Sequence, residues 1–427
     1  MNVAIVGAGY AGLAAGVGFA MCGNSVFLVD VDEDKVEMIN QSKAPIHEEG
    51  LDTLLPSLSH RIKATTNTNV AVERAEIIFL CVQTSCGKNG SIDLTHIKQA
   101  ATNVGKALQS SRITYPIVST KSTVVPGTTE KIIKPILEEE SGKKAGVDFG
   151  ITVNPEFLRM GKSIEDFLHP DRTVIGEMET IDGDILCELY KDISGPIIRV
   201  DCKTAEMAKY ASNIFLATKI SLVNEIGNIC KRLGIDVYEV AQVMGFDKRI
   251  TRHFLDAGIG YGGSCLPKDI DAIISAAREI GYQPSLLQCV SALNKDQPLR
   301  LVEMAQSKVG DLSGKKVAVL GLSFKPGTDD IRHSPSFSIV GELIKRGAII
   351  KAYDPAAMER TKAIFDHEID YTASAREAVE ECDLVFVATG WSEFCDPALY
   401  EGKTVFDGRR VVNPSQLKNC DYEGVCW

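Results

Sequence analysis

The chain has 427 residues, which is too long for one ordinary globular core and predicts about three domains. Hydrophobic residues make up 44% and charged residues 24% of the sequence, a composition typical of globular proteins. The net charge of -11 argues against a basic nucleic-acid surface, so we expect no nucleic-acid partner. The N-terminus MNVAIVGAGY lacks a basic signal region, and no apolar run reaches ~18 residues. We therefore predict a cytoplasmic protein with no membrane partner.

The first 200 residues alternate short apolar runs with amphipathic segments. A helix is predicted over 10–23, directly after the first apolar run. Strands are predicted at residues 2–9, 25–30, 75–82, 116–120, 147–154, 172–176 and 196–200. Strands that alternate with helices form βαβ units, so we expect a mostly parallel sheet in this part of the chain.

The pattern changes between residues 202 and 308. Residues 204–234 carry apolar side chains at a spacing of three to four, and Gly234 is a natural C-terminal stop. Further helical periodicity follows at 236–245, 268–281 and 285–309. These features predict a long central helix followed by helices that make subunit contacts.

The first pattern restarts at residue 313. Strands are predicted at 313–324, 348–354, 382–390 and 403–408, with a helix over 336–347. We therefore predict an α/β protein with two Rossmann-like doubly wound domains, joined by a long central helix and a helical dimerisation domain. The expected domains are 1–201, which binds the cofactor, 202–310, the helical connector, and 311–427, the second Rossmann-like domain.

The sequence VAIVGAGYAGL places Gly7, Gly9 and Gly12 as G-x-G-x-x-G between a strand and a helix. This motif is typical of dinucleotide binding, because the glycines allow a tight turn and let the backbone approach a pyrophosphate at a helix N-terminus. Asp30 ends the second strand 18 residues after Gly12, where a carboxylate can accept hydrogen bonds from ribose hydroxyls. A 2′-phosphate would meet this negative charge, so NAD is favoured over NADP. We also place Tyr10, Ala11 and Lys35 at this cofactor site.

Twelve cysteines occur without any C-x-x-C pair, which argues against a zinc ribbon or a disulfide framework. We expect free thiols, most of them buried, and no metal. Cys265 differs because it lies in GYGGSCLPKD, a glycine-rich loop that enters a helix. A thiol at a helix start can have a lowered pKa, so residue types alone leave a catalytic nucleophile and a structural cysteine both open.

GYGGSCLPKD occurs together with GAGYAGL, NPEFLRMG, HPDRTVIG, AEMAKYASN and GLSFKPGTDDIR. With these motifs in this order, the chain resembles the UDP-glucose/GDP-mannose dehydrogenase family over nearly its full length, and most of all the family's UDP-glucose branch. The resemblance implies a UDP-sugar substrate and NAD as the cofactor. It implies four-electron oxidation of UDP-glucose to UDP-glucuronate through a thiohemiacetal and a thioester on Cys265.

Two alternatives stay open beside this function. One is a sister nucleotide-sugar dehydrogenase that acts on GDP-mannose or a UDP-N-acetylhexosamine. The other is a non-catalytic protein that binds NAD or a nucleotide sugar on the same scaffold.

The resemblance also implies roles for individual residues. Lys209 would stabilise the developing oxyanion, and Asn213, four residues later, would face the same substrate atom. Asp269 would support proton transfer through a water. Glu156 would activate the hydrolytic water and Thr123 would line the site, next to the cofactor as well. Without the resemblance, Lys209 fits a solvated helix residue, Asp269 a helix N-terminal carboxylate and Glu156 a turn residue.

The same resemblance implies binding residues. Thr84 and Arg332 are expected at the cofactor, and Lys325 at the UDP phosphates, with Phe324 near the base. Arg249 would reach the substrate of a second subunit, which implies a homodimer or a higher homo-oligomer. The other expected substrate contacts are Phe157, Leu158, Phe254, Leu255, Tyr261 and Gly262, the last by allowing close backbone approach.

Four positions depart from the family pattern. Met160 and His333 stand where glutamates are frequent, Gly390 replaces another such glutamate in ATGWSEF, and CVQTSC lacks the usual proline after Thr84. These departures bear on the choice of substrate more than on the class of reaction.

Overall fold

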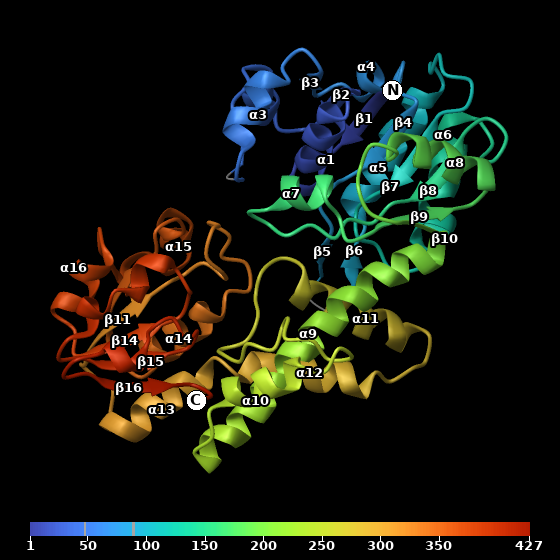
Figure 1. Cartoon of the computed structure of the whole chain (residues 1–427). Coiled ribbons are helices and arrows are strands. Elements are labelled where there is room, and N and C mark those ends of the chain that lie inside the picture. The colour runs from blue at the N-terminus through green and yellow to red at the C-terminus, as the bar shows by residue number, and fades with distance from the viewer. Residues whose placement is uncertain (47, 88–89) are drawn as a thin grey trace. The chain divides into compact units, whose positions relative to one another are not determined.

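The computed structural model describes residues 1–46, 48–87 and 90–427. The chain divides into two compact units, Met1–Ser212 and Asn213–Trp427. Each is an α/β unit built around its own sheet (Figure 1). The two units are described separately below.

The first unit holds an eight-stranded sheet in the order β10-β9-β8-β7-β4-β1-β2-β3. All neighbouring strands are parallel except β8 and β9, which are antiparallel. The strands are β1 (Asn2–Val6), β2 (Ser25–Val29), β3 (Ile62–Thr65), β4 (Ile77–Leu80), β7 (Ile117–Thr120), β8 (Gly150–Val153), β9 (Thr173–Glu177) and β10 (Ile197–Asp201). A separate hairpin pairs β5 (Ser85–Cys86) with β6 (Ile92–Asp93). The seven predicted strands are confirmed, and β3 is an addition.

Helices cover both faces of this sheet. Val3 and Ile5 of β1 are buried in one core cluster, whereas Ala4 and Val6 are buried in another, because successive strand residues point to opposite faces. The first cluster also contains α1 residues and Phe167 of α7, and the second contains α5 residues. The helices are α1 (Tyr10–Met21), α2 (Glu33–Asn40), α3 (Leu51–Ser57), α4 (Thr68–Val72), α5 (Thr95–Leu108), α6 (Lys134–Ser141), α7 (Ser163–Leu168) and α8 (Thr180–Leu189), with a π-helix η1 (Thr129–Ile133) before α6. The doubly wound arrangement is therefore confirmed for this unit.

The central helix α9 (Cys202–Leu233) is a single helix of 32 residues that starts in the first unit and ends in the second. Gly234 follows it with φ +71°, a left-handed conformation that ends a helix without a Cβ clash. Short helices then occupy most of the chain up to residue 309: α10 (Val237–Gly245), α11 (Leu266–Glu279), α12 (Ser285–Asp296) and α13 (Leu299–Val309). Pro298 separates the last two, where one continuous helical pattern was predicted.

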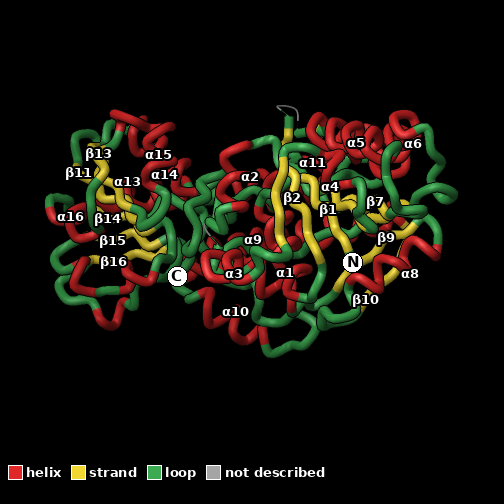
Figure 2. Tube along the Cα trace, turned by 90° about the horizontal axis from the view of Figure 1, so that it is seen from above, coloured by secondary structure: helices red, strands yellow, loops and turns green. Residues whose placement is uncertain are grey.

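The second unit holds a six-stranded, wholly parallel sheet in the order β13-β12-β11-β14-β15-β16. Its strands are β11 (Lys316–Leu320), β12 (Ile349–Tyr353), β13 (Asp370–Tyr371), β14 (Leu384–Val387), β15 (Thr404–Asp407) and β16 (Asp421–Gly424). Its other helices are α14 (Pro335–Lys345), α15 (Met358–Phe365) and α16 (Ala375–Glu380), with 3-10 turns η2 (Asp366–Glu368), η3 (Ser392–Cys395), η4 (Pro397–Tyr400) and η5 (Pro414–Gln416). Val317 and Ala318 of β11 again enter different core clusters, so this sheet too is covered on both faces. Figure 2 shows the large sheet of each unit with helices around it.

Across the part of the chain that the structure describes, no helix combines the length and the apolar composition needed to cross a lipid bilayer.

Candidate active site

The glycine loop after β1 packs closely against other backbone atoms of the chain. Gly7 has φ +107°, and a Cβ there would stand 2.5 Å from the carbonyl oxygen of Cys81. A Cβ at Gly12 would collide with the carbonyl oxygen of Gly7. Gly9 differs, because a Cβ there would meet no atom of the described residues within 4 Å. The space beside Gly9, at the start of α1, is therefore left open for another molecule.

Asp30 closes this loop from the end of β2. Its carboxylate accepts hydrogen bonds from the backbone N–H of Ala8 at 2.8 Å and of Asp32 at 3.1 Å, and the ammonium of Lys35 lies 4.0 Å away. The N-cap of α1 is Gly9, which offers no side-chain acceptor, so the first turn of the helix keeps N–H groups for an anion. Tyr10 and Ala11 lie in that turn and are half-buried. This donor and acceptor set fits the pyrophosphate and ribose of NAD.

Thr84 and Thr123 are brought together from the ends of neighbouring strands. The hydroxyl of Thr84 donates to the carbonyl oxygen of Thr123 at 2.9 Å, and that of Ser122 donates to the carbonyl oxygen of Val82 at 2.7 Å. The segments after β4 and β7 are therefore bonded side by side, at the edge of the sheet that also carries the glycine loop.

Glu156 and Lys209 form an ion pair of 3.0 Å in the first unit, with the lysine side chain 5% exposed. The carboxylate of Glu156 also accepts the backbone N–H of Leu158 at 2.6 Å. Burial alone would raise the pKa of Glu156, but the charge of Lys209 and the Leu158 bond outweigh it and hold this pKa below its usual value. Glu156 is therefore held as an anion next to a cation, the state that a general base requires.

Arg172, which lies in the motif HPDRTVIG, joins this group, and it is not among the predicted site residues. Its guanidinium carbon lies 3.9 Å from the ring centroid of Phe157, and one of its nitrogens donates to the hydroxyl of Ser212 at 3.1 Å. The ammonium of Lys209 lies 5.4 Å from the same ring. Phe157 thus packs against two cations, which fixes the segment that follows β8.

Glu48 is a second residue that the sequence did not reveal. Its buried carboxylate accepts the N–H of Gly161 at 2.9 Å and of Ser163 at 2.6 Å, 113 and 115 residues away. Arg159 in the same segment forms a 2.6 Å ion pair with Asp166. The segment from Glu156 to Ser163 is therefore anchored along its length.

In the second unit, Cys265 is the N-cap of α11 and is exposed. One turn into this helix, the carboxylate of Asp269 is 1% exposed, and it accepts hydrogen bonds from Asn213 Nδ2 and Lys268 Nζ, each at 2.6 Å. The loop thus presents a thiol to solvent, while the helix behind it holds a buried, hydrogen-bonded carboxylate.

The glycines before Cys265 make room for the chain's own backbone. A Cβ at Gly262 would collide with the carbonyl oxygen of His333, and one at Gly263 would stand 2.8 Å from the ring of Phe324. Gly263 N–H donates to the carbonyl oxygen of Arg332 at 2.8 Å. The close backbone approach expected at Gly262 is therefore made by residue 333.

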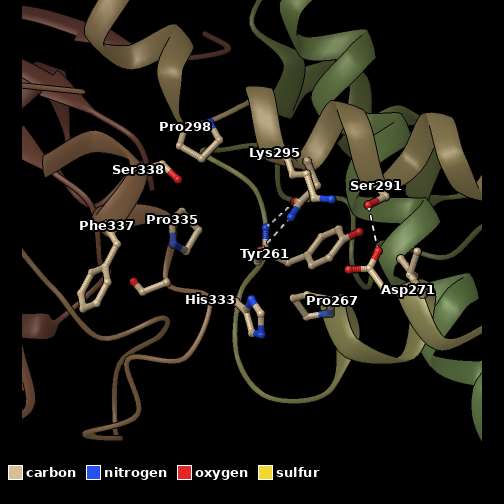
Figure 3. A pocket seen from close by; sticks show the side chains of 13 residues that line it. Tyr261, Pro267, Asp271, Ser291, Lys295, Pro298, His333, Pro335, Phe337 and Ser338 are labelled. Atoms are coloured by element: carbon tan, nitrogen blue, oxygen red, sulfur yellow. Dashed lines mark hydrogen bonds between the residues drawn. The ribbon is translucent and has the colours of Figure 1, made fainter. Parts of the chain in front are cut away.

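Tyr261 is fixed by Asn294, which bonds both its backbone N–H and its carbonyl oxygen at 2.9 Å. Its ring lines a cavity of about 240 Å³ within the second unit. Figure 3 shows Tyr261 and Pro267 on one side of this cavity and His333, Pro335 and Phe337 on the other.

The remaining predicted binding residues lie at several places in the second unit. Arg249 forms a 2.6 Å ion pair with Asp247 in its own loop. Phe254 is exposed with φ +62°, and Leu255 beside it is buried. Lys325 Nζ lies 5.7 Å from the ring centroid of Phe324, and Arg332 is bonded to Asp330 at 2.9 and 2.7 Å.

All twelve cysteines are free thiols, as predicted. The expectation that most are buried is wrong, because only Cys81, Cys202, Cys230, Cys382 and Cys426 are buried, and Cys289 and Cys395 are exposed like Cys265. Exposure alone therefore does not single out Cys265. Among residues 1–46, 48–87 and 90–427, no group of three or more His, Cys, Asp or Glu side chains is arranged to hold a metal ion.

Comparison with known proteins adds to this geometry. Residues 1–194, 203–296 and 318–414 match the NAD binding, central and UDP binding domains of the UDP-glucose/GDP-mannose dehydrogenase family. UDP-glucose 6-dehydrogenase AglM of Haloferax volcanii is 43% identical over 100% of both chains, and GDP-mannose 6-dehydrogenase of Pseudomonas putida is 36% identical over 100% of both. The solved structure of a UDP-glucose dehydrogenase from Pyrobaculum islandicum matches with a TM-score of 0.95 at 38% identity, covering 100% of this chain and 97% of that one.

Proposed function

Because this chain belongs to the UDP-glucose/GDP-mannose dehydrogenase family and contains its NAD binding domain, we propose that it oxidises UDP-glucose to UDP-glucuronate, with Cys265 as the nucleophile. The observation that carries this proposal is the arrangement at the start of α11. An exposed thiol caps the helix, and a buried carboxylate bonded by Asn213 lies one turn behind it. A protein that only binds nucleotide sugars has no need of that combination.

Bound NAD supplies the hydride acceptor for both oxidation steps. Overall, one alcohol, two NAD and one water give one carboxylic acid, two NADH and two protons. Between the two oxidations the Cys265 sulfur adds to the aldehyde carbon, forming a C–S bond. The second oxidation leaves a thioester, and water then cleaves the C–S bond and returns the thiol. A thiolate suits both steps, because it adds readily to a carbonyl and also leaves readily.

The other residues have roles that match their surroundings. We assign the hydrolytic base to Glu156, because it is ionised and lies beside a cation. Lys209 and Asn213, one turn apart on α9, are the donors for the oxygen that becomes negative. Asp269 supports proton transfer, and Thr123 lines the site beside Thr84.

UDP-glucose is favoured over a sister nucleotide sugar by the relative that is 43% identical and by the solved structure at TM-score 0.95, both of them UDP-glucose dehydrogenases. We assign Lys325 and Phe324 to the UDP moiety, and Arg249, Phe157, Leu158, Phe254, Leu255 and Tyr261 to the rest of the substrate pocket. Asp30 favours NAD over NADP, because its carboxylate stands where a 2′-phosphate would be repelled. Arg332 completes the proposed cofactor contacts.

A homodimer of this chain is part of the proposal. The second-unit part of α9 exposes Phe215, Leu222, Ile229 and Leu233, which are spaced by seven, seven and four residues and so follow one side of the helix. Four large apolar side chains on one helix face are typical of a surface that another protein covers. A second copy is the occupant we propose, with 202–310 as the dimerisation domain between domains 1–201 and 311–427, in a cytoplasmic enzyme.

The test is a panel of nucleotide sugars with purified protein and NAD. UDP-glucose, GDP-mannose and two UDP-N-acetylhexosamines are compared, and NADH is counted against consumed sugar. We expect the highest kcat/KM with UDP-glucose and two NADH per sugar. A preference for another sugar would support the sister enzyme, one NADH per sugar would exclude the four-electron route, and no NADH from any sugar would support a binding protein.

A further inference from the structure

Lys121 is a buried cation at the end of β7, two residues before Thr123. It is 4% exposed, and among the described residues no carboxylate pairs with it within 4.0 Å. A lysine ammonium loses its hydration on burial, so its neighbours must compensate for that loss. The groups that compensate for this loss therefore indicate the role of Lys121.

Its three N–H groups have three oxygen acceptors. Lys121 Nζ lies 2.7 Å from Asn154 Oδ1, 3.4 Å from the carbonyl oxygen of Asn154 and 3.3 Å from the hydroxyl of Tyr190. The Tyr190 hydroxyl donates to the same Asn154 Oδ1 at 2.5 Å, which leaves its oxygen lone pair for the lysine. The ring centroids of Phe79, Phe167 and Tyr190 lie 5.6 to 6.0 Å from the ammonium.

This network fixes the chain that leads to Glu156. Asn154 directly follows β8, and the carbonyl that Lys121 contacts belongs to the peptide just before Pro155-Glu156. The Asn154 amide donates to the carbonyl oxygen of Val174 in β9 at 2.9 Å. Lys121 itself donates its backbone N–H to Leu80 of β4. The side chains of Lys121 and Asn154, together with the backbone of Lys121, thereby connect four neighbouring strands at the edge that carries the proposed catalytic groups.

The titratable groups around Lys121 also indicate Glu156 as its electrostatic partner. Burial lowers the pKa of Lys121 to about 8, while the thiol of Cys81 and the carboxylate of Glu156 oppose that shift and the cation of Lys209 adds to it. Tyr190 faces it as a neutral phenol, because burial keeps its pKa well above the ordinary value. Glu156 is the one of these neighbours that is ionised as an anion near pH 7, since the pKa of Cys81 is raised by burial to about 12.

We propose that Lys121 is a positioning residue for the reaction: through Asn154 and Tyr190 it fixes the segment that carries Glu156, and it supplies the Glu156 carboxylate with a second positive charge besides that of Lys209. This inference rests on the proposed role of Glu156 in hydrolysis. Lys121 itself contacts no substrate in this arrangement.

The kinetic test compares Lys121→Met with wild type and with Lys98→Met, the same substitution at an exposed lysine of α5. With less positive charge near Glu156, the acid limb of the kcat profile for UDP-glucose oxidation should move to higher pH by about one unit. The KM for UDP-glucose should change less than kcat. An acid limb that stays in place while kcat falls would overturn the electrostatic part of the proposal and leave Lys121 a packing residue.

A second measurement does not depend on activity, so it separates failure of this inference from failure of the proposed function. Thermal unfolding midpoints at pH 7 are measured for Lys121→Met, Glu156→Gln and the double variant. If the two groups stabilise each other, the unfolding midpoint of the double variant falls by less than the sum of the two single decreases. Additive losses would overturn the proposal whatever the enzyme oxidises.

Tyr190→Phe provides a milder variant in case Lys121→Met does not fold. It removes one acceptor of the Lys121 ammonium and leaves the charge in place. We expect a shift of the acid limb in the same direction but smaller, with coupling to Glu156→Gln of the same sign. No shift and no coupling in a folded Tyr190→Phe would overturn the network as the element that positions Glu156.

Discussion

Lys209 Nζ donates a hydrogen bond of 3.0 Å to the carboxylate of Glu156, 53 residues earlier in the chain, in a part of the first unit that excludes most solvent. The pair joins α9 to the segment after β8, and it makes the ionised form of Glu156 the stable one. If Glu156 is the hydrolytic base, then the ionised state that this contact stabilises is needed in the last step of the proposed reaction, the hydrolysis of the thioester.

Glu156→Gln should therefore trap the enzyme at the thioester. We expect a burst of about two NADH per active site followed by turnover lowered by about 10² to 10⁴, the range that general base catalysis contributes. Intact-mass measurement after the burst should find the protein heavier by one covalently bound nucleotide-sugar acyl group. Glu165→Gln, at an exposed glutamate of α7, serves as the control with ordinary turnover. Steady turnover of Glu156→Gln at the wild-type rate would remove Glu156 from the mechanism.

Cys265→Ser should abolish acid production, because a hydroxyl is far less acidic than a thiol, so it adds less readily to the aldehyde, and it is a poorer leaving group than a thiolate. At most one NADH per active site is expected from UDP-glucose. Cys289→Ser changes another exposed thiol and should retain wild-type activity. Release of UDP-glucuronate by Cys265→Ser, measured by chromatography of the product, would exclude the covalent route.

Asp30→Ala should weaken NAD binding by at least about tenfold, because one hydrogen bond to a charged acceptor contributes about 1.5 to 3 kcal/mol. NADP affinity should fall less or rise, because the repulsion of a 2′-phosphate is removed. Isothermal titration with both cofactors measures the ratio, and Asp34→Ala, at an exposed residue of α2, is the matched control. An unchanged NAD-to-NADP ratio would contradict the role given to Asp30.

The buried Lys121 makes stability depend on pH in the alkaline range. Its pKa is lowered from 10.5 to about 8 in the folded chain, so between these values the unfolded chain binds more protons and the free energy of unfolding rises with pH. Relative to Lys121→Met, the free energy of unfolding of wild type should rise by up to about 3 kcal/mol from pH 8 to pH 10.5. It should show no such rise below pH 7. Urea unfolding across this range, with Lys98→Met as the control, measures the difference. Parallel curves for wild type and Lys121→Met would show that the lysine is not held as described.

The exposed apolar side of α9 predicts the oligomeric state. Phe215→Glu with Ile229→Glu should convert a dimer to a monomer, because two charges would be buried without partners in the interface. Light scattering after size exclusion measures the mass. Val147→Glu, at an exposed valine between α6 and β8, should leave the mass unchanged. A wild-type monomer at micromolar concentration would contradict the proposed dimer.

Much of the fold follows from local patterns in the sequence. The run 204–234 predicts the long helix because its apolar spacing persists for some thirty residues and ends at a glycine, and the structure has α9 there. The antiparallel direction of β9 against β8 could not be predicted, since the fully buried run TVIG has no feature that depends on strand direction. The same is true of β3, whose residues alternate exposed and buried over only four positions.

Some residues of the candidate site can likewise be recognised from the sequence, and others cannot. Gly7, Gly12 and Asp30 are recognisable because they act through neighbours in one βαβ unit. Glu48 and Lys121 were not recognised, because their partners lie 113 and 33 residues away and become neighbours only when the sheet forms. A signal was present for Lys121: a lysine directly after a wholly buried strand stands where no solvent is available.

The contact between Gly262 and residue 333 limits how such enzymes can be re-engineered. Because the carbonyl oxygen of His333 and the ring of Phe324 occupy the space that a Cβ would need at Gly262 and Gly263, the loop that carries Cys265 and the segment 324–333 form a matched pair. A chimera that imports the thiol loop from a relative with a different sugar preference has to import the second segment as well, or it will carry a steric clash in place of a new specificity.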